Sequence, residues 1–245
     1  SQRTQTWILR ASVVVLTGWV GQISLAPLAF AGVAGFSLVR LSEAHLGLAA
    51  PVLAVAVAAV VAHVPGDVVE NDWFTAQGLE TNDEWIRSRS GIERRRFVRD
   101  LSVNTSDLGA EALRKALAKA GWDALDLEAI VCATSTPEFS YPATGVLVQG
   151  KVGALNAFAY DVMAACTGFV VALNAASLLV SSGQCRRVAV VCAELNSRVL
   201  DMTDRNSCVL FGDGAGAVLL EAREDGSGVI GSALKSDGRL EGILH

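Results

Sequence analysis

The sequence predicts an α/β protein with a mixed, mainly parallel sheet and covering helices, preceded by a hydrophobic helical segment. After residue 63, short apolar runs of strand length alternate with amphipathic stretches of helical length. The charged residues of segment 1–62 are only three arginines and one glutamate, which give a net charge of +2. Because the whole chain has a net charge of −5, residues 63–245 have a net charge of −7. The overall hydrophobic content of 51% is high for a soluble protein, and the excess lies in that first part. The chain is therefore expected to divide into residues 1–62 and 63–245.

Two uncharged runs dominate the first segment. Ala11 to Val39 contains no charged residue, and Leu46 to Ala62 is a second run rich in alanine, valine and leucine. Each is near or above the length of a helix that crosses a bilayer. A two-helix hairpin would leave everything after residue 63 on the cytoplasmic side, by the positive-inside rule. We therefore expect a membrane anchor through residues 11–62, the alternative being buried helices of a soluble fold.

The second segment begins with a helix near Thr81. Thr81 can cap its N-terminus, and Asp83 and Glu84 place acids in the first turn. Trp85 and Arg89 lie four residues apart and so share one face of this helix. The pair is either a packed tryptophan with a stacked arginine or a site for an adenine with phosphates.

The alternation of helices and strands then continues towards the C-terminus. A helix opens at Thr105, has apolar residues at helical spacing, and stops at Gly121. The elements expected after it are the strand Ala129–Thr134, the helix Ala143–Val152, the strand Ala157–Val162, the helix Val170–Ser181 and the strand Arg187–Ala193. In open α/β sheets, reactive groups gather at the C-terminal ends of the strands.

A glycine-dense run, Phe211–Ala217, follows the last of these strands. Its GxGxG spacing is not that of a dinucleotide loop, because no long helix follows it. It is either a turn between two strands that packs closely against a neighbour, or part of a functional site.

Cys166 lies at such a strand end, where the run Ala159–Val162 gives way to the helix. Exposed N–H groups and the dipole at a helix N-terminus favour thiolate over thiol, which predicts a nucleophile. The alternative is a small buried hydrophobe, as most free cysteines are. The other four cysteines lie in apolar contexts, which predicts reduced core residues of a cytosolic domain and supports neither a disulfide framework nor a metal site. A pI near 5.2 argues against a nucleic-acid partner.

Together these residues resemble β-ketoacyl-acyl-carrier-protein synthase III, an initiating condensing enzyme of the thiolase-like superfamily. The resemblance covers residues 64 to about 240 in the order of that family. The matching words are Val64–Asn71, Thr81–Ile86 with Ser90–Ile92, Ala133–Pro137, Asp161–Phe169 and Phe211–Ala217. It implies a thiolase-like fold and an enzyme that initiates fatty-acid or polyketide synthesis.

The resemblance also implies roles for single residues. Cys166 would accept the acyl group of a short acyl-CoA, the only small-molecule substrate, for condensation with malonyl-acyl carrier protein, and no cofactor is implied. The residues matching contacts to CoA are Thr81, Trp85, Arg89 and Arg205, with Trp85 and Arg205 on either side of the adenine. Phe211 matches an aromatic beside the cysteine, and Tyr141 matches one that reaches across a homodimer into the partner's pocket.

The sequence departs from the family at two places. The family begins with a glycine-containing strand just before the Val64 position, and Ala56–His63 stands there instead, either as a substitute strand or as part of the membrane segment. The second departure is at the end of the sequence. Family members continue into a second half that carries a His and an Asn for the decarboxylation step, and His245 is reached before either appears. The expectation is an incomplete synthase, with acyl transfer to Cys166 as the most it could perform. The alternatives are a membrane-anchored or permease-derived fusion protein without catalysis, and an accidental join of two sequences near residue 62.

A second resemblance concerns the first segment alone. The words Leu16–Leu25 and Leu28–Phe36 resemble part of the permease subunit of branched-chain amino-acid ABC transporters. The segment of about residues 11–62 is too short for a transport pathway, so this resemblance implies a permease fragment and no transport.

Overall fold

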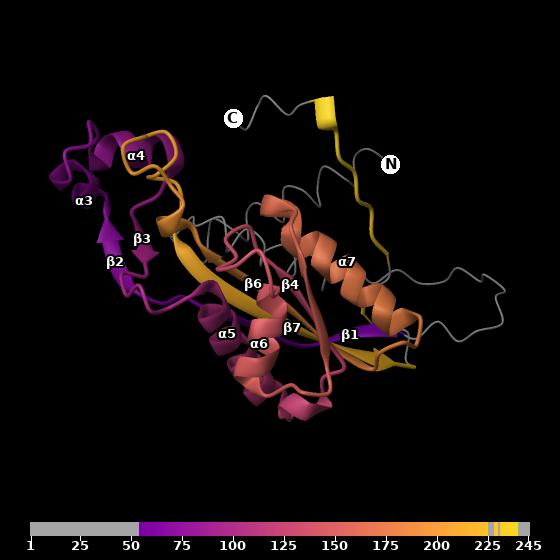
Figure 1. Cartoon of the computed structure of the whole chain (residues 1–245). Coiled ribbons are helices and arrows are strands. Elements are labelled where there is room, and N and C mark those ends of the chain that lie inside the picture. Colours follow the sequence, from indigo (N-terminus) through magenta and orange to yellow (C-terminus); the bar gives the residue numbers. More distant parts are fainter. Residues whose placement is uncertain (1–53, 225–227, 230, 240–245) are drawn as a thin grey trace.

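The structure of this protein, a computed structural model, describes residues 54–224, 228–229 and 231–239. Its elements form one main sheet with helices on both faces and a smaller group of elements at one end (Figure 1). In chain order they are β1 (Ala54–His63), β2 (Asp67–Glu70), α3 (Asn71–Ala76), α4 (Asp83–Ser90), β3 (Arg94–Phe97), α5 (Thr105–Ala120), η1 (Ala124–Asp126), β4 (Ala129–Ala133), α6 (Thr144–Val152), β5 (Phe158–Val162), η2 (Ala165–Thr167), α7 (Gly168–Ser181), β6 (Arg187–Leu195), η3 (Asn196–Arg198) and β7 (Asp213–Arg223).

The main sheet has five strands in the order β1-β7-β6-β4-β5. β4 pairs in parallel with both β5 and β6, whereas β7 is antiparallel to β6 and to β1. The sheet is therefore mixed, as predicted, but the prediction that it is mainly parallel is wrong. A parallel return from β6 would need a crossover helix. The chain instead makes η3 and a series of turns between the two strands, and β7 comes back antiparallel.

Of the two alternatives for Ala56–His63, the strand is confirmed, and it begins two residues earlier, at Ala54. Ala54–His63 forms an edge strand that pairs with β7 from Ala54 opposite Arg223 to His63 opposite Ala215. The expected helix over Leu46–Ala62 is therefore wrong from Ala54 onwards. β1 is a partly buried edge strand, and such a short apolar run has no periodicity that separates a strand from a buried helix.

The other expectations for the N-terminal segment lie outside the described residues. These are the helices before Ala54, the permease resemblance of residues 11–62 and the membrane anchor. Among the helices that the structure describes, none has both the length and the apolar character to cross a membrane.

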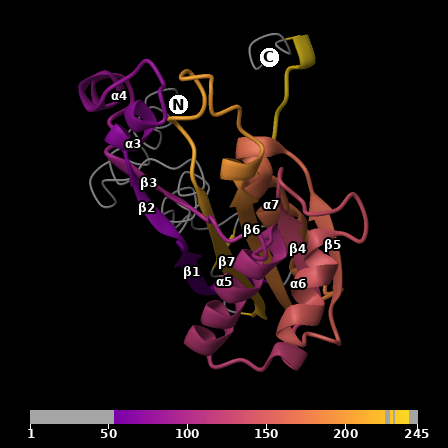
Figure 2. The same ribbon diagram turned by 60° about the vertical axis from the view of Figure 1, so that its left-hand side comes forward.

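Helices α5 and α6 cover one face of the sheet, and α7 covers the other (Figure 2). Both α5 and α7 form where the sequence places them, and α5 ends at Gly121 in the left-handed region at a φ of 68°. The N-cap of α5 is Asn104 rather than Thr105, and the Asp107 carboxylate accepts a hydrogen bond from the Asn104 N–H at 2.8 Å. Helical spacing locates a helix well, but caps are decided by local geometry.

Elements α3, α4, β2 and β3 and the segment 199–211 form a small subdomain at one end of the sheet (Figure 1). It has its own core, in which Phe74, Ile86 and Ile92 are each about 1% exposed. Cys208 and Val209 of the distant segment pack into that same core. The subdomain thus brings together residues that are more than a hundred positions apart in the sequence.

The glycine-dense run is not a turn between two strands, because Asp213–Arg223 is one continuous strand that contains Gly214 and Gly216. The predicted close packing of the glycine-dense run against a neighbouring segment is present at Gly212, which lies against β3. A Cβ there would lie 3.1 Å from the Cβ of Arg95 and 3.2 Å from the carbonyl oxygen of Arg96. Gly212 therefore allows the end of the small subdomain to pack against β3.

Asp213 joins this run to two other segments. Its buried carboxylate accepts hydrogen bonds from the Val98 N–H at 2.7 Å, from the Ser197 N–H at 2.9 Å and from the Ser197 hydroxyl at 2.6 Å. All three donors would lack an acceptor without it. The carboxylate ties β7 to the end of β3 and to η3.

We expect Asp213→Asn to lower the free energy of unfolding by about 1–3 kcal/mol, because an amide offers one acceptor oxygen and adds donors where three donors already point. Urea unfolding measures the change. Asp123→Asn is the matched control, since Asp123 is exposed and asparagine caps a helix about as well as aspartate. Equal effects of the two substitutions would contradict the role given to Asp213.

Candidate active site

Cys166 lies in η2, between the end of β5 and the first turn of α7, and its side chain is exposed. The residue before it, Ala165, has a φ of 44°, and it is the one non-glycine residue with positive φ among those the structure describes. Such backbone strain is typical of functional turns. Gly168 completes the close turn, because a Cβ there would lie 3.3 Å from the Cβ of Ala133 in β4. The predicted setting, a thiol at a helix N-terminus, is confirmed.

The other four cysteines differ from Cys166 in exposure. Cys132, Cys185 and Cys208 are buried, and Cys192 is half-buried. Burial raises the pKa of each thiol, that of Cys192 to about 12. These four thiols stay protonated at neutral pH, and Cys166 differs from them in being exposed.

A second group of predicted residues meets in the small subdomain. The guanidinium carbon of Arg89 lies 4.4 Å from the centroid of the Trp85 ring, and that of Arg205 lies 4.8 Å from it. Arg205 also donates a hydrogen bond to the carbonyl oxygen of Glu80 at 2.7 Å. Two cations over one indole make a positive, planar surface of the kind that suits an aromatic base with phosphates.

Thr81 lies two residues before the start of α4, and the prediction that it caps this helix is wrong. The N-cap is Asn82, whose side chain accepts a hydrogen bond from the Trp85 N–H at 2.7 Å. The Thr81 hydroxyl is buried and has no hydrogen-bond partner among the described residues. A buried hydroxyl without a partner among the described residues has an unused hydrogen bond, and Thr81 lies four residues before Trp85.

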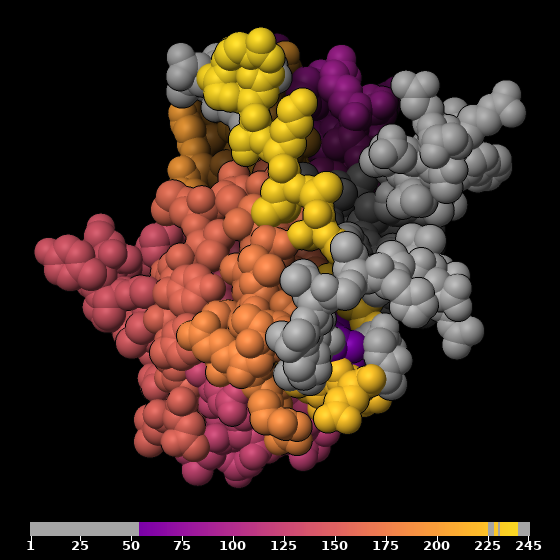
Figure 3. Space-filling view, turned by 90° about the vertical axis from the view of Figure 1, so that its right-hand side faces the viewer, coloured from indigo at the N-terminus to yellow at the C-terminus, as the bar shows by residue number. Residues whose placement is uncertain are grey.

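Tyr141 and Phe211 are the two residues predicted to line a pocket. Tyr141 is 86% exposed in the loop between β4 and α6, which projects from the body of the molecule (Figure 3). Phe211 is half-buried in the segment directly before β7. These positions do not test whether Phe211 lines the active site beside Cys166 or whether Tyr141 lines the pocket of a partner subunit. Both roles stay predictions.

Sequence reasoning missed an acid at the end of β6. The Glu194 carboxylate accepts hydrogen bonds from the Ser135 N–H at 2.7 Å and from the Thr136 hydroxyl at 2.6 Å. Burial raises the pKa of Glu194, against the lowering effect of these bonds. Its function is to hold the loop after β4 against the end of β6. A glutamate closing an apolar strand, Ala193-Glu194-Leu195, was the signal that could have revealed it.

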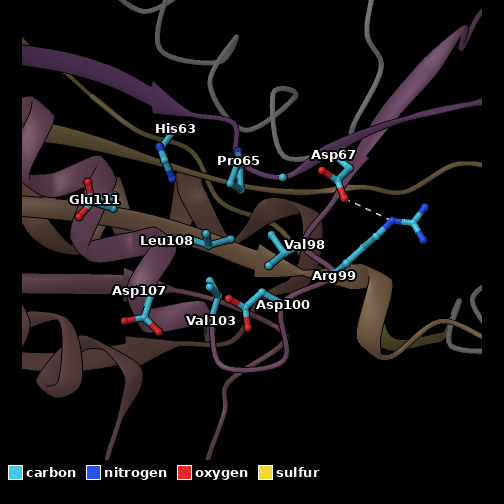
Figure 4. Close-up of a pocket in the computed structure, with 11 residues that line it drawn as sticks. His63, Pro65, Asp67, Val98, Arg99, Asp100, Val103, Asp107, Leu108 and Glu111 are labelled. Carbon is cyan, nitrogen blue, oxygen red and sulfur yellow. Dashed lines mark ion pairs between the residues drawn. The ribbon is translucent and has the colours of Figure 1, made fainter.

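The structure also contains a cavity of about 400 Å³ between the end of β1, the chain after β3, and α5 (Figure 4). Asp67 and Arg99 form an ion pair of 3.5 Å at its edge. His63 lies at the opposite side, 2.8 Å from the Lys115 ammonium, and burial followed by that positive charge lowers the pKa of His63. None of the predicted site residues lines this cavity. Within the described ranges, no cluster of three or more His, Cys, Asp or Glu side chains could hold a metal ion.

Comparison with known proteins gives one consistent family. The profile described as 3-oxoacyl-[acyl-carrier-protein (ACP)] synthase III matches residues 160–238. The β-ketoacyl-[acyl-carrier-protein] synthase III of Rhodobacter capsulatus is 50% identical over 188 residues, which are 75% of this chain and 57% of that protein. That of Ehrlichia canis is 46% identical over 184 residues, again 75% of this chain and 57% of that protein.

Solved structures agree with the sequence matches. The synthase III of Thermus thermophilus is 39% identical with a TM-score of 0.73, covering 78% of this chain and 58% of that one. The priming β-ketosynthase of the R1128 polyketide pathway is 34% identical with a TM-score of 0.68, covering 73% and 53%. The chain thus spans rather more than half the length of the relatives it matches. The described part of the chain has the thiolase-like fold of the β-ketoacyl-[acyl-carrier-protein] synthases III and is similar to them in sequence over three quarters of its length.

Proposed function

We propose that Cys166 accepts an acyl group from acyl-CoA, as the first step of a synthase of the β-ketoacyl-[acyl-carrier-protein] synthase III type. The observation that carries the proposal is the exposed thiol at the N-terminus of α7, directly after the strained Ala165. The sequence identity of about 50% to curated synthases III supports acyl transfer as the class of reaction. We expect the protein in the cytoplasm, where such a thiol stays reduced.

The chemistry follows from the position of the sulfur. The Cys166 thiolate attacks the carbonyl carbon of the thioester, a carbon–sulfur bond forms, and the carbonyl oxygen takes the negative charge. When the intermediate collapses, the bond to the sulfur of CoA breaks and CoA leaves as a thiolate, which takes up a proton in place of the one Cys166 lost. Cys166 comes directly before the first turn of α7, and its exposed side chain is accessible to a thioester in solution.

The CoA nucleotide would bind at the small subdomain. Trp85 offers a face for the adenine, Arg89 and Arg205 offer positive charge for phosphates, and the buried Thr81 hydroxyl offers an unused hydrogen bond. A base between two stacking partners needs roughly 7 Å, twice the contact distance of about 3.5 Å between carbon atoms. Arg205 lies 4.8 Å from the Trp85 ring, so the base would have to separate this pair on binding.

The second step, condensation with malonyl-acyl carrier protein, is a further part of the proposal. The resemblance assigns it to a His and an Asn that have no counterpart at the described residues. His63, the one histidine in the described ranges, lies at the end of β1 beside Lys115. The step that we assign to the described residues is therefore acyl transfer to Cys166, with acyl-CoA as the substrate.

Incubation with acetyl-CoA followed by mass spectrometry of the intact chain and of its peptides tests the proposal. An acetyl group on the peptide that contains Cys166 supports it. A chain that stays unmodified at saturating acetyl-CoA contradicts it and favours the non-catalytic alternative, in which the domain serves only for folding or association.

We also propose a homodimer that forms at the edge of β5. β5 is the last strand of the main sheet, and large apolar side chains lie exposed on and around it: Phe158 is 45% exposed, Met163 73% and Leu155 70%. An exposed apolar edge strand is a template for pairing with another chain. A second copy would cover it and bring Tyr141 of the projecting loop towards its partner.

We expect the parent chain to sediment as a dimer and Phe158→Lys to shift it to monomer, because a buried charge at a paired edge is costly. Analytical ultracentrifugation measures the shift. Leu101→Lys is the control, since Leu101 is 83% exposed in the segment between β3 and α5, which is not part of the β5 edge. A parent chain that is monomeric at all concentrations would contradict the proposal.

A further inference from the structure

Arg95 of β3 is a buried cation that has no ion pair with a carboxylate among the described residues. It is 2% exposed, and its three hydrogen bonds go to the carbonyl oxygen of Val69 at 3.2 Å, the amide oxygen of Asn71 at 2.7 Å and the carbonyl oxygen of Val209 at 2.9 Å. Its guanidinium carbon lies 4.7 Å from the centroid of the Phe74 ring. Burial lowers the pKa of Arg95 to about 10, so the side chain is still charged at neutral pH.

The acceptors of Arg95 belong to three separate segments. Val69 is in β2, Asn71 begins α3, and Val209 lies in the segment that comes back from the end of the main sheet. The planar guanidinium, with five donors in a fixed fork, can bond all three at once. An arginine at this place therefore fixes the distance between β2 and the segment 199–211.

Asn71 extends the connection to the helix that carries Trp85. Its amide nitrogen donates to the Asp83 carboxylate at 2.8 Å and to the carbonyl oxygen of Ile92 at 2.7 Å. Asp83 is the first residue of α4, and Ile92 follows its C-terminal end. Arg95 and Asn71 together thus hold both ends of α4.

Val209 connects Arg95 to Arg205 through one compact turn. The Cys208 N–H donates to the carbonyl oxygen of Asp204 at 3.0 Å, and the Asp204 carboxylate accepts from the Asn206 N–H at 3.0 Å and from the Ser207 hydroxyl at 2.6 Å. A turn held in this way moves as a unit. Its inner end is tied to Arg95, and its outer end is tied to Glu80 through Arg205.

We infer that Arg95 is a positioning residue, which holds the turn bearing Arg205 against the helix bearing Trp85 and so sets the spacing of the nucleotide site. The inference rests on the proposed function in its assignment of CoA to this site. Arg95 itself is buried beneath the site and does not contact the ligand. Arg95 acts by setting the distance between Trp85 and Arg205, and a bound base must fit between these two side chains.

The test compares the parent chain with Arg95→Lys, because a lysine keeps the charge but cannot reach three acceptors in a plane. Acetylation of Cys166 is followed by mass spectrometry with two donors, acetyl-CoA and the small thioester S-acetyl-N-acetylcysteamine, which has no nucleotide. With subsaturating acetyl-CoA we expect the rate to fall by roughly 10-fold to 100-fold, the scale of a misplaced binding group. With the small thioester we expect a change within about 2-fold, because the chemistry at Cys166 is unaltered.

Hydrogen exchange provides a measurement that does not depend on CoA. In Arg95→Lys, we expect faster exchange in peptides covering residues 82–92 and 199–211 and unchanged exchange in the main sheet. Asn71→Ala, the milder second variant, should speed exchange in residues 82–92. Arg187→Lys is the matched control, since Arg187 also lies over a tryptophan, 4.5 Å from the Trp122 ring, away from the small subdomain.

Each failure has a distinct signature. If the parent is acetylated by neither thioester, the proposed function fails, and the exchange experiment still decides the role of Arg95. Unchanged exchange in both segments, or equal rate losses with both thioesters, overturns the inference. Loss of folding in both Arg95→Lys and Asn71→Ala also overturns it, because Arg95 would then stabilise the whole fold instead of one site.

Discussion

Replacing Cys166 by serine is expected to abolish acetylation of the chain by acetyl-CoA. A serine hydroxyl is a much weaker nucleophile than a cysteine thiol near neutral pH. The rate should therefore fall by roughly 10³-fold or more, as when a covalent nucleophile is removed from other enzymes. The measurement is the fraction of intact chain that gains one acetyl mass, followed over time. The fold should be unaffected, because the side chain is exposed.

Cys185→Ser is the matched control for this experiment. Cys185 is 2% exposed, and burial raises the pKa of its thiol, so its loss should leave acetylation at the rate of the parent chain. Acetylation that persists in Cys166→Ser would show that another group accepts the acyl chain. In that case, the conclusion drawn from the turn at Ala165 and from α7 would be wrong.

The second large effect is expected at the nucleotide site. Trp85→Ala removes the stacking face and Arg205→Ala removes a stacking cation, and each should weaken CoA binding by about 1–3 kcal/mol, the usual contribution of a base stacked on an aromatic side chain. This corresponds to roughly a 5-fold to 150-fold rise in Kd. Isothermal titration with CoA measures it, and acetylation by S-acetyl-N-acetylcysteamine should stay near the parent rate.

Trp122→Ala is the control for that measurement. Trp122 stacks with Arg187 at 4.5 Å, much as Trp85 stacks with Arg205 at 4.8 Å, but it lies beside η1. It should alter stability without altering the affinity for CoA. If Trp122→Ala weakens CoA binding as much as Trp85→Ala does, the nucleotide does not bind at the small subdomain.

Local patterns in the sequence were enough for most of the elements. Helices α5 and α7 and strands β4, β5 and β6 form within a few residues of their predicted bounds, because apolar residues recur at the spacing of each structure. The sequence did not decide the secondary structure where a neighbouring segment determines it. Ala54–His63 becomes a strand because β7 is beside it to accept its hydrogen bonds, and the alanine-rich run itself favours neither structure.

The candidate site divides in the same way. Cys166 could be recognised from its own surroundings, since a strand end, small residues and a helix start are all adjacent to it in the sequence. Trp85 and Arg89 are four residues apart on one helix, so their contact is also local. The partner Arg205 was named only through the family resemblance, because nothing in its local sequence points to a tryptophan so far along the chain.

The sequence by itself determined the helices, most of the strands, and a cysteine at a helix N-terminus, because each depends on residues close together along the chain. Only the tertiary structure decided the antiparallel return of β7 and the meeting of Trp85 with Arg205. It also decided the burial of Arg95 and Asp213 and the partial burial of Glu194, whose partners come from other segments. Burial and long-range hydrogen bonds depend on which segments become neighbours, and no window of the sequence contains that information.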